Sequence, residues 1–129
     1  MKTLRVGIAS YEQMKARTIA IARGEYRPTA DEPKVWFRSA ESFARVLSDR
    51  NRDLLGIIAE STPESLARLA EMTGRKKSNL SRTLKTMERY GFVHLSRGAR
   101  GSVMARVPYQ RISLTLLLSK PGHRGTKAA

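Results

Sequence analysis

The side chains best suited to chemistry lie between residues 76 and 100, and they are mainly hydrogen-bond donors. The set consists of Lys76, Lys77, Ser78, Asn79, Ser81, Arg82, Lys85, Arg89, Arg97 and Arg100. Lysine and arginine stay positively charged at neutral pH, and arginine and asparagine can form two hydrogen bonds to one flat partner. These residue types predict the binding of a polyanion and not the making or breaking of covalent bonds.

Positive charge is concentrated in the second part of the chain. The 129 residues hold 25 Lys and Arg against 11 Asp and Glu, a net charge of +14 with an isoelectric point near 11.1. Residues 1–74 are nearly balanced, with 12 basic and 10 acidic residues, whereas residues 75–129 hold 13 and 1. Between Arg75 and Arg111, ten basic residues accompany a single acid, Glu88. A surface of one sign indicates a nucleic-acid partner.

Catalysis and metal binding are not expected. The chain has no cysteine, and its two histidines, His94 and His123, lie far apart. No nucleophile motif, glycine-rich phosphate loop or acidic metal cluster accompanies them, so we expect neither an enzyme nor a cofactor. No apolar run is long enough to span a bilayer, and the start of the chain has too short an apolar stretch for a secretory signal. We therefore expect no membrane association and a cytoplasmic location.

Most of the candidate donors are expected to lie on one helix. Leu80, Leu84 and Met87 recur at i, i+4 and i+7, which predicts a helix over residues 76–90 with one buried stripe. Four polar residues recur at spacings of four, three and four, and therefore share the opposite face. They are Ser78, Arg82, Lys85 and Arg89.

Two shorter helices are expected before this one. Ser48 or Asp49 begins the first, whose broad apolar face contains Leu54, Leu55, Ile57 and Ile58. Thr62 then supplies a cap for the second helix, with Pro63 at its first position and Gly74 closing it. After the helix over 76–90, Gly91 ends the helical pattern. Extended runs at 92–95 and 103–107 flank the turn at 97–101, which predicts a hairpin with Arg97 and Arg100 at its tip.

The rest of the chain contributes strands and helices outside this central pattern. Residues 3–8 alternate as a half-buried strand, and Ser10 with Gln13 forms a capping box for a helix in which Met14, Ile19 and Ile21 offer apolar contacts. Residues 27–33 are a connector, residues 35–37 a short strand, and Ser39 a cap for another helix. Trp36, Phe37 and Phe43 are expected in the core. Residues 112–118 alternate as a final strand, and the tail from Pro121 is expected to be disordered.

The order of helix, short helix, glycine turn, helix and two-stranded ribbon is the layout of a winged helix-turn-helix. We therefore predict a mainly helical α+β fold with a winged helix-turn-helix at 49–110. Residues 1–48 form an N-terminal strand and helix extension suited to dimerisation, residues 111–119 a C-terminal strand, and 120–129 a disordered tail.

A winged helix-turn-helix assigns roles to the donors. Asn79 can pair with adenine and Arg82 with guanine, so both are predicted to read bases in the major groove. Lys76, Lys77, Ser78, Ser81 and Lys85 are predicted to contact phosphates. Arg97 and Arg100 are placed to enter a narrow minor groove. The sequence thus predicts a binder of double-stranded DNA.

Residues 49–110 resemble MarR-like and related winged-helix transcriptional regulators. The motifs that carry the resemblance are Ser65-Leu66-Ala67-Arg68-Leu69-Ala70, Gly74, Ser78-Asn79-Leu80-Ser81-Arg82-Thr83-Leu84 and Tyr90-Gly91-Phe92-Val93. The box Glu32-Pro33-Lys34-Val35-Trp36-Phe37 is similar to one in predicted prokaryotic winged-helix regulators. The resemblance implies transcriptional control. Lys76 departs from the Ser or Thr cap of many such proteins, so the cap is expected to move to Ser78.

A lone winged helix covers little duplex, so we expect a homodimer that reads two half-sites and acts as a repressor. The strands at 3–8 and 112–118 and the first helix are the candidates for the dimer surface. Two alternatives remain open at this point. The first is an RNA-binding or ribosome-associated module, because phosphate attraction alone does not separate RNA from DNA. The second is an antitoxin-like or bridging winged helix that binds a protein partner.

Overall fold

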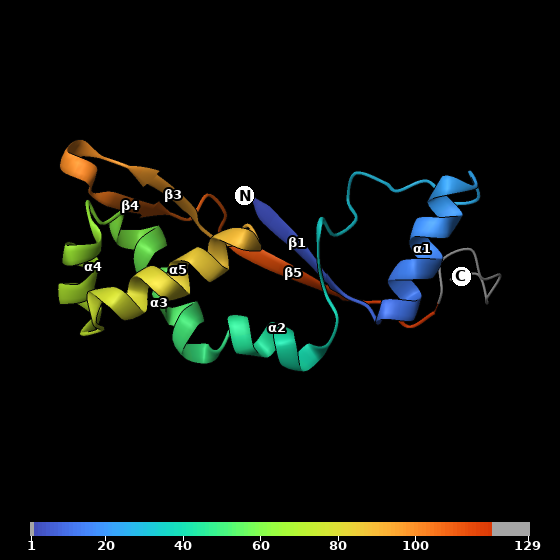
Figure 1. Ribbon diagram of the computed structural model, residues 1–129, viewed down its shortest axis with the longest axis horizontal. Coiled ribbons are helices and arrows are strands. Elements are labelled where there is room, and N and C mark those ends of the chain that lie inside the picture. The colour runs from blue at the N-terminus through green and yellow to red at the C-terminus, as the bar shows by residue number, and fades with distance from the viewer. Residues whose placement is uncertain (1, 120–129) are drawn as a thin grey trace. The chain divides into compact units, whose positions relative to one another are not determined.

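The computed structural model describes residues 2–119, and its fold is α+β, as the sequence predicts (Figure 1). The elements in chain order are β1 (Thr3–Ile8), α1 (Tyr11–Ala22), β2 (Val35–Phe37), α2 (Ala40–Val46), α3 (Asp49–Ser61), α4 (Leu66–Thr73), α5 (Lys77–Arg89), β3 (His94–Arg97), a 3-10 turn (Ala99–Gly101), β4 (Val103–Arg106) and β5 (Arg111–Leu116). The chain divides into two compact units, whose boundaries fall within β1, α2 and β5. Residues 5–43 and 112–119 form the sheet unit, and residues 2–4 and 44–111 form the helical unit. The predicted disordered tail lies outside the described residues.

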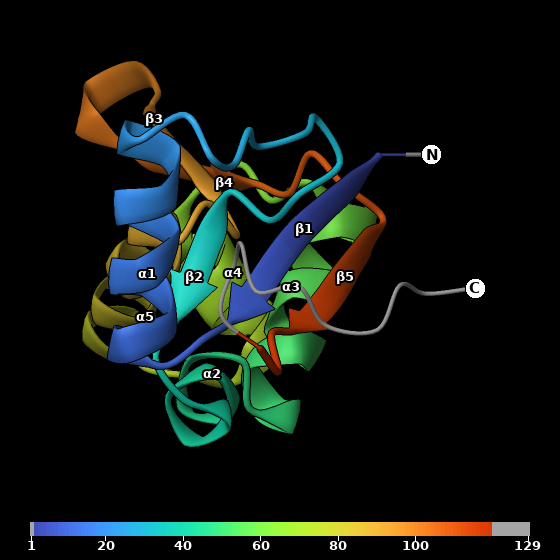
Figure 2. The same ribbon diagram turned by 90° about the vertical axis from the view of Figure 1, so that its right-hand side faces the viewer.

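The sheet unit is built on three strands in the order β2-β1-β5 (Figure 2). β1 and β2 are parallel, and Gly7 lies opposite Trp36. The Trp36 ring covers Gly7 so closely that a Cβ atom at this position would lie 2.4 Å from a ring carbon. Phe37 is buried and meets Phe43 edge to face at 5.5 Å between ring centroids, which confirms the expected core role of Phe37.

Helix α1 begins where the capping box predicts. The Ser10 hydroxyl accepts from the Gln13 amide at 3.1 Å, and the Gln13 side-chain oxygen accepts from the Ser10 amide at 2.8 Å. Gln13 also donates from its side-chain nitrogen to the Leu117 carbonyl at 2.9 Å, which ties the first turn of α1 to the chain just after β5. Ile19, expected to offer an apolar contact, is 40% exposed, and the buried residue of α1 is Ala20.

The core of the helical unit is formed by the facing sides of α3, α4 and α5 (Figure 1). The fully buried side chains of these helices are Leu54, Ile58, Leu69, Leu80, Leu84 and Met87. Phe92 is also fully buried, at the point where the chain leaves α5 for β3. The hydrophobic spacing of the sequence thus selects the faces that pack.

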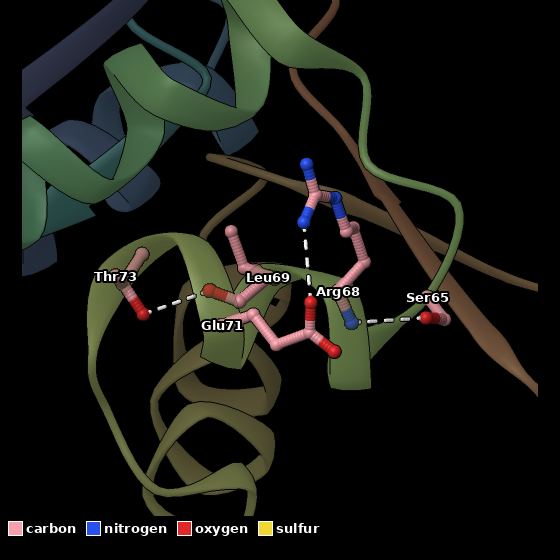
Figure 3. A network of polar contacts seen from close by, with 5 residues as sticks. All are labelled: Ser65, Arg68, Leu69, Glu71 and Thr73. Atoms are coloured by element: carbon pink, nitrogen blue, oxygen red, sulfur yellow. Dashed lines mark hydrogen bonds and ion pairs between the residues drawn. The ribbon is translucent and has the colours of Figure 1, made fainter.

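The predicted start of α4 at Thr62-Pro63 is wrong. Thr62 ends α3 instead, in a left-handed conformation with φ 42°, and its amide donates to the Ile58 carbonyl at 3.0 Å. The cap of α4 is Ser65, whose hydroxyl accepts from the Arg68 amide at 3.1 Å (Figure 3). Pro63 lies in the connector between α3 and α4, and its carbonyl accepts a hydrogen bond from the Arg106 guanidinium at 2.8 Å.

Two side-chain contacts form within α4. Arg68 pairs with Glu71 at 3.1 Å, and the Thr73 hydroxyl donates to the Leu69 carbonyl at 2.8 Å (Figure 3). Gly74 then adopts φ 73°, a left-handed conformation that glycine accepts without strain, and ends the helix as predicted. The turn into α5 therefore follows from the position of this one glycine.

Candidate nucleic-acid interface

Helix α5 has one buried face and one cationic face. Leu80 and Leu84 are 0% exposed and Met87 is 1% exposed, so this stripe anchors α5 in the core. The residues predicted to share the opposite face are all exposed. They are Ser78, Arg82, Lys85 and Arg89. Packing of the leucine stripe therefore forces the basic stripe toward solvent.

The start of α5 is also exposed and rich in donors. Lys76, Lys77, Ser78 and Asn79 are exposed, while Ser81 in the next turn is half-buried. The expected move of the cap to Ser78 is wrong. Lys76 occupies the cap position with extended backbone, and its carbonyl accepts from the Leu80 amide at 3.0 Å, but its side chain makes no capping bond. The first-turn amides of α5 therefore keep the partial positive charge of a helix N-terminus.

The predicted hairpin is formed by β3 and β4, which pair antiparallel with His94 opposite Arg106 and Arg97 opposite Val103. The tip closes through a hydrogen bond of 2.6 Å from the Gly98 amide to the Ser102 carbonyl. Arg97 and Arg100 are both exposed there. Arg100 has φ 59°, a left-handed conformation that costs about 1 kcal/mol or more for a residue with a side chain. The hairpin thus holds an arginine where glycine or asparagine would be less strained.

A groove of about 240 Å³ lies between α5 and the hairpin. Its apolar wall is formed by Leu66, Leu84, Leu95 and Val103. Lys85 from α5 and Arg97 from β3 both line it, with Ser81, Glu88 and Ser96. The Glu88 carboxylate accepts from the Leu95 amide at 3.2 Å. The groove therefore brings cations from helix and hairpin to one surface.

The candidate cations are not neutralised by neighbouring acids. Within residues 2–119, the ion pairs are made by Arg17, Arg52 and Arg68, and none of the predicted site residues takes part in one. Glu88, the one acid of the region 75–111, is partly committed to the Leu95 amide. The surface formed by α5 and the hairpin therefore carries net positive charge that an external polyanion can compensate.

Two arginines counted in the basic region are structural. Arg75 is 8% exposed, and its guanidinium donates to the Asn51 side-chain oxygen at 3.2 Å and to the Arg50 carbonyl at 3.1 Å. Burial lowers the pKa of Arg75, and the nearby charge of Arg50 acts in the same direction. Arg106 is half-buried against the Pro63 carbonyl. Sequence periodicity gives no signal for these contacts, because each partner lies more than 20 positions away.

Comparison with known proteins identifies the family of this chain. A family model described as HVO_A0114 matches residues 46–114, more than half of the 129 residues. The chain belongs to the HVO_A0114 family. No curated protein and no solved structure matches it.

The segment shared with the HVO_A0114 family contains α3, α4, α5 and the β3–β4 hairpin, and with them all ten predicted site residues. The match does not bear on the resemblance to MarR-like regulators, which stays a prediction. Within residues 2–119, no helix is both long and apolar enough to cross a membrane. In the same part of the chain, no three His, Cys, Asp or Glu side chains gather in a way that would hold a metal ion.

Proposed function

We propose that this chain is a sequence-specific binder of double-stranded DNA that regulates transcription, acting as a repressor and as a homodimer. In this proposal α3, α4, α5 and the β3–β4 hairpin are a winged helix-turn-helix, with α5 as the recognition helix. The observation that carries it is the unpaired cationic surface of α5 and the hairpin, which is fixed in place by the buried leucine stripe.

The dimensions of α5 suit the major groove of DNA. Its 13 residues span about 20 Å at 1.5 Å per residue, and a helix with side chains is about 10–12 Å wide, close to the groove width of about 12 Å. The exposed Asn79 and Arg82 are proposed to read bases. Lys76, Lys77, Ser78, Ser81 and Lys85 are proposed to bind phosphates, and the first-turn amides of α5 add partial positive charge nearby.

The hairpin is proposed as the wing. Arg97 and Arg100 are exposed at its tip, and a narrow minor groove attracts arginine through its negative potential. The strained backbone of Arg100 supports this role, since nothing in the hairpin itself requires a large side chain at φ 59°. Repression would follow from occupation of an operator by two copies, each reading one half-site.

The test is selection from a random duplex pool, followed by titrations at several salt concentrations. Arg82→Ala should weaken binding by about 1–3 kcal/mol and relax preference at one base pair. Lys85→Ala should weaken all sequences equally and reduce the slope of log K against log salt by about one. Arg52→Ala is the matched control, because Arg52 is exposed on α3 and already paired with Asp49.

The alternatives are separate outcomes of the same titrations. Equal affinity for RNA and duplex DNA, with no sequence selected, would favour an RNA-binding module. Absence of binding to either nucleic acid would contradict the proposal and favour a winged helix that binds a protein. A reversed pattern for Arg82 and Lys85 would overturn the division between base and phosphate contacts.

A further inference from the structure

Strand β5 is an edge strand. In the sheet order β2-β1-β5 it has one neighbour, β1, among the described residues (Figure 2). Its other side therefore presents backbone amides and carbonyls that no described strand pairs. Natural proteins usually protect such an edge with charged residues or proline. The first residue of β5, Arg111, is charged, and its guanidinium donates to the Thr3 hydroxyl at 3.2 Å. Residues 112–119, Ile-Ser-Leu-Thr-Leu-Leu-Leu-Ser, contain neither.

An exposed apolar stripe runs along this edge strand and just beyond it. Leu114 is 43% exposed, Leu116 57% and Leu118 90%. Successive side chains of a strand point to opposite faces, so Leu114 and Leu116 of β5 belong to one face, and Leu118 follows two residues after the strand ends. The prediction that residues 112–118 alternate is thus correct for β5, but its leucine face is not covered by the sheet unit. An unprotected edge and an exposed stripe together indicate a surface that is covered in solution.

The charge distribution favours a second copy of this chain as the partner that covers the edge of β5. The sheet unit, residues 5–43 and 112–119, holds seven basic and five acidic residues, a net charge of +2. The described residues of the helical unit hold 15 and six, a net charge of +9. Two copies therefore repel each other most through their helical units and least through their sheet units.

Symmetry makes β5 complementary to itself. When two copies of an edge strand pair antiparallel about a two-fold axis perpendicular to the sheet, the same face of each lies on the same side. Residues that lie directly opposite then have numbers of equal parity. Leu114 and Leu116 of one copy consequently lie on the same face as Leu114 and Leu116 of the other and pack against them, and both rows of free backbone groups become hydrogen-bonded.

We propose that this protein dimerises by antiparallel pairing of β5 with β5 of a second copy, giving one continuous sheet of six strands. This interface does not depend on DNA binding. It specifies which part of the predicted dimer surface is used: the edge of β5, and not α1 or β1.

The first experiment measures molecular mass by size exclusion with light scattering. The wild-type protein should give twice the chain mass of 14.5 kDa, and Leu116→Asp should give the mass of one chain. Ile19→Asp is the matched control, since Ile19 is an exposed apolar residue of α1 in the same unit, and it should stay dimeric. Circular dichroism and the fluorescence of the single tryptophan, Trp36, check that each variant is folded.

The second experiment uses the absence of cysteine from the chain. Single cysteines are placed in turn at positions 113 to 117, and Ala22→Cys serves as an exposed control. A two-fold axis perpendicular to the sheet always places one residue opposite its own copy, with Cα atoms about 4.5–5.5 Å apart, which a disulfide can span. Mild oxidation should therefore cross-link one of these positions, or two neighbouring ones, and leave Ala22→Cys uncrosslinked.

The proposal is overturned if the wild-type chain is monomeric, if Leu116→Asp stays dimeric, or if none of the five cysteine positions cross-links. It is equally overturned if Ile19→Asp becomes monomeric while Leu116→Asp does not. A dimer that binds no duplex DNA would refute the proposed function and leave this interface standing. A folded Leu116→Asp monomer that retains weak duplex binding would support both.

Discussion

Arg75 provides a direct test of which arginines hold the fold and which are free to bind. Replacing it with methionine keeps much of the aliphatic stem and removes the guanidinium. The guanidinium satisfies two acceptors, the Asn51 side-chain oxygen and the Arg50 carbonyl, at 3.1–3.2 Å. Arg75 is 8% exposed, so water replaces it poorly at this site.

The loss can be estimated from the two acceptors. A buried acceptor left without a donor costs about 1–3 kcal/mol, and the lower half of this range applies because the contacts are only partly buried. With two acceptors, Arg75→Met should therefore lower the free energy of unfolding by about 2–4 kcal/mol. For a chain of this length that corresponds to a fall in Tm of roughly 8–16 °C, at about 4 °C per kcal/mol.

Urea denaturation and duplex titration, run on the same variants, separate stability from binding. Arg82→Met, on the exposed face of α5, should unfold within about 0.5 kcal/mol of wild type and lose duplex affinity. Arg75→Met should be less stable but bind normally at a temperature where it is folded. In an Asn51→Ala background, the Arg75 replacement should cost less, because one acceptor is already gone. Wild-type stability of Arg75→Met would refute the structural role assigned to this residue.

The remaining predictions concern Arg100, whose backbone is strained, and two glycines with different surroundings, Gly7 and Gly56. Arg100→Gly should stabilise the hairpin by up to about 1 kcal/mol, as measured by hydrogen exchange, because glycine accepts φ 59°. The same change should weaken duplex binding in a titration. Unchanged affinity would show that Arg100 is not part of the proposed interface. Gly7→Ala should destabilise the chain by about 1–3 kcal/mol in urea, since the new methyl group would lie 2.4 Å from the Trp36 ring. At Gly56 in α3, no atom of the described residues outside the local helix backbone lies within 4 Å of an added Cβ, so Gly56→Ala should instead stabilise by about 0.5–1 kcal/mol. Equal effects at both glycines would contradict the contact with Trp36.

Local patterns in the sequence predict the elements of this fold well. The strand over 3–8, the capping box at Ser10 and the termination at Gly74 are found as expected, because each depends on residues within a few positions of one another. The start of α4 was the main local error. Both Thr62-Pro63 and Ser65 are acceptable starts by residue type, and the choice depends on how α3 ends and on the contact of Arg106 with the Pro63 carbonyl.

The ten candidate site residues could be chosen from the sequence because charge and helical spacing are both visible there. The sequence does not show which of the basic residues lie on the surface. Arg75 and Lys76 are adjacent in the chain, yet Arg75 is buried against Asn51 and Lys76 is exposed. The difference arises from an approach of α3 to the turn before α5, and no periodicity of either segment encodes that approach.

Short-range spacing and residue type are enough to predict the order of helices and strands, the face of α5 that is buried, and the sign of the charge on the opposite face. The position of β5 at a sheet edge with its leucines exposed, and the groove lined by both Lys85 and Arg97, are known from the folded chain alone. An alternating strand pattern is the same at the centre and at the edge of a sheet. Strand order is set by contacts between segments that are distant in the chain, and so it becomes visible only once the chain has folded.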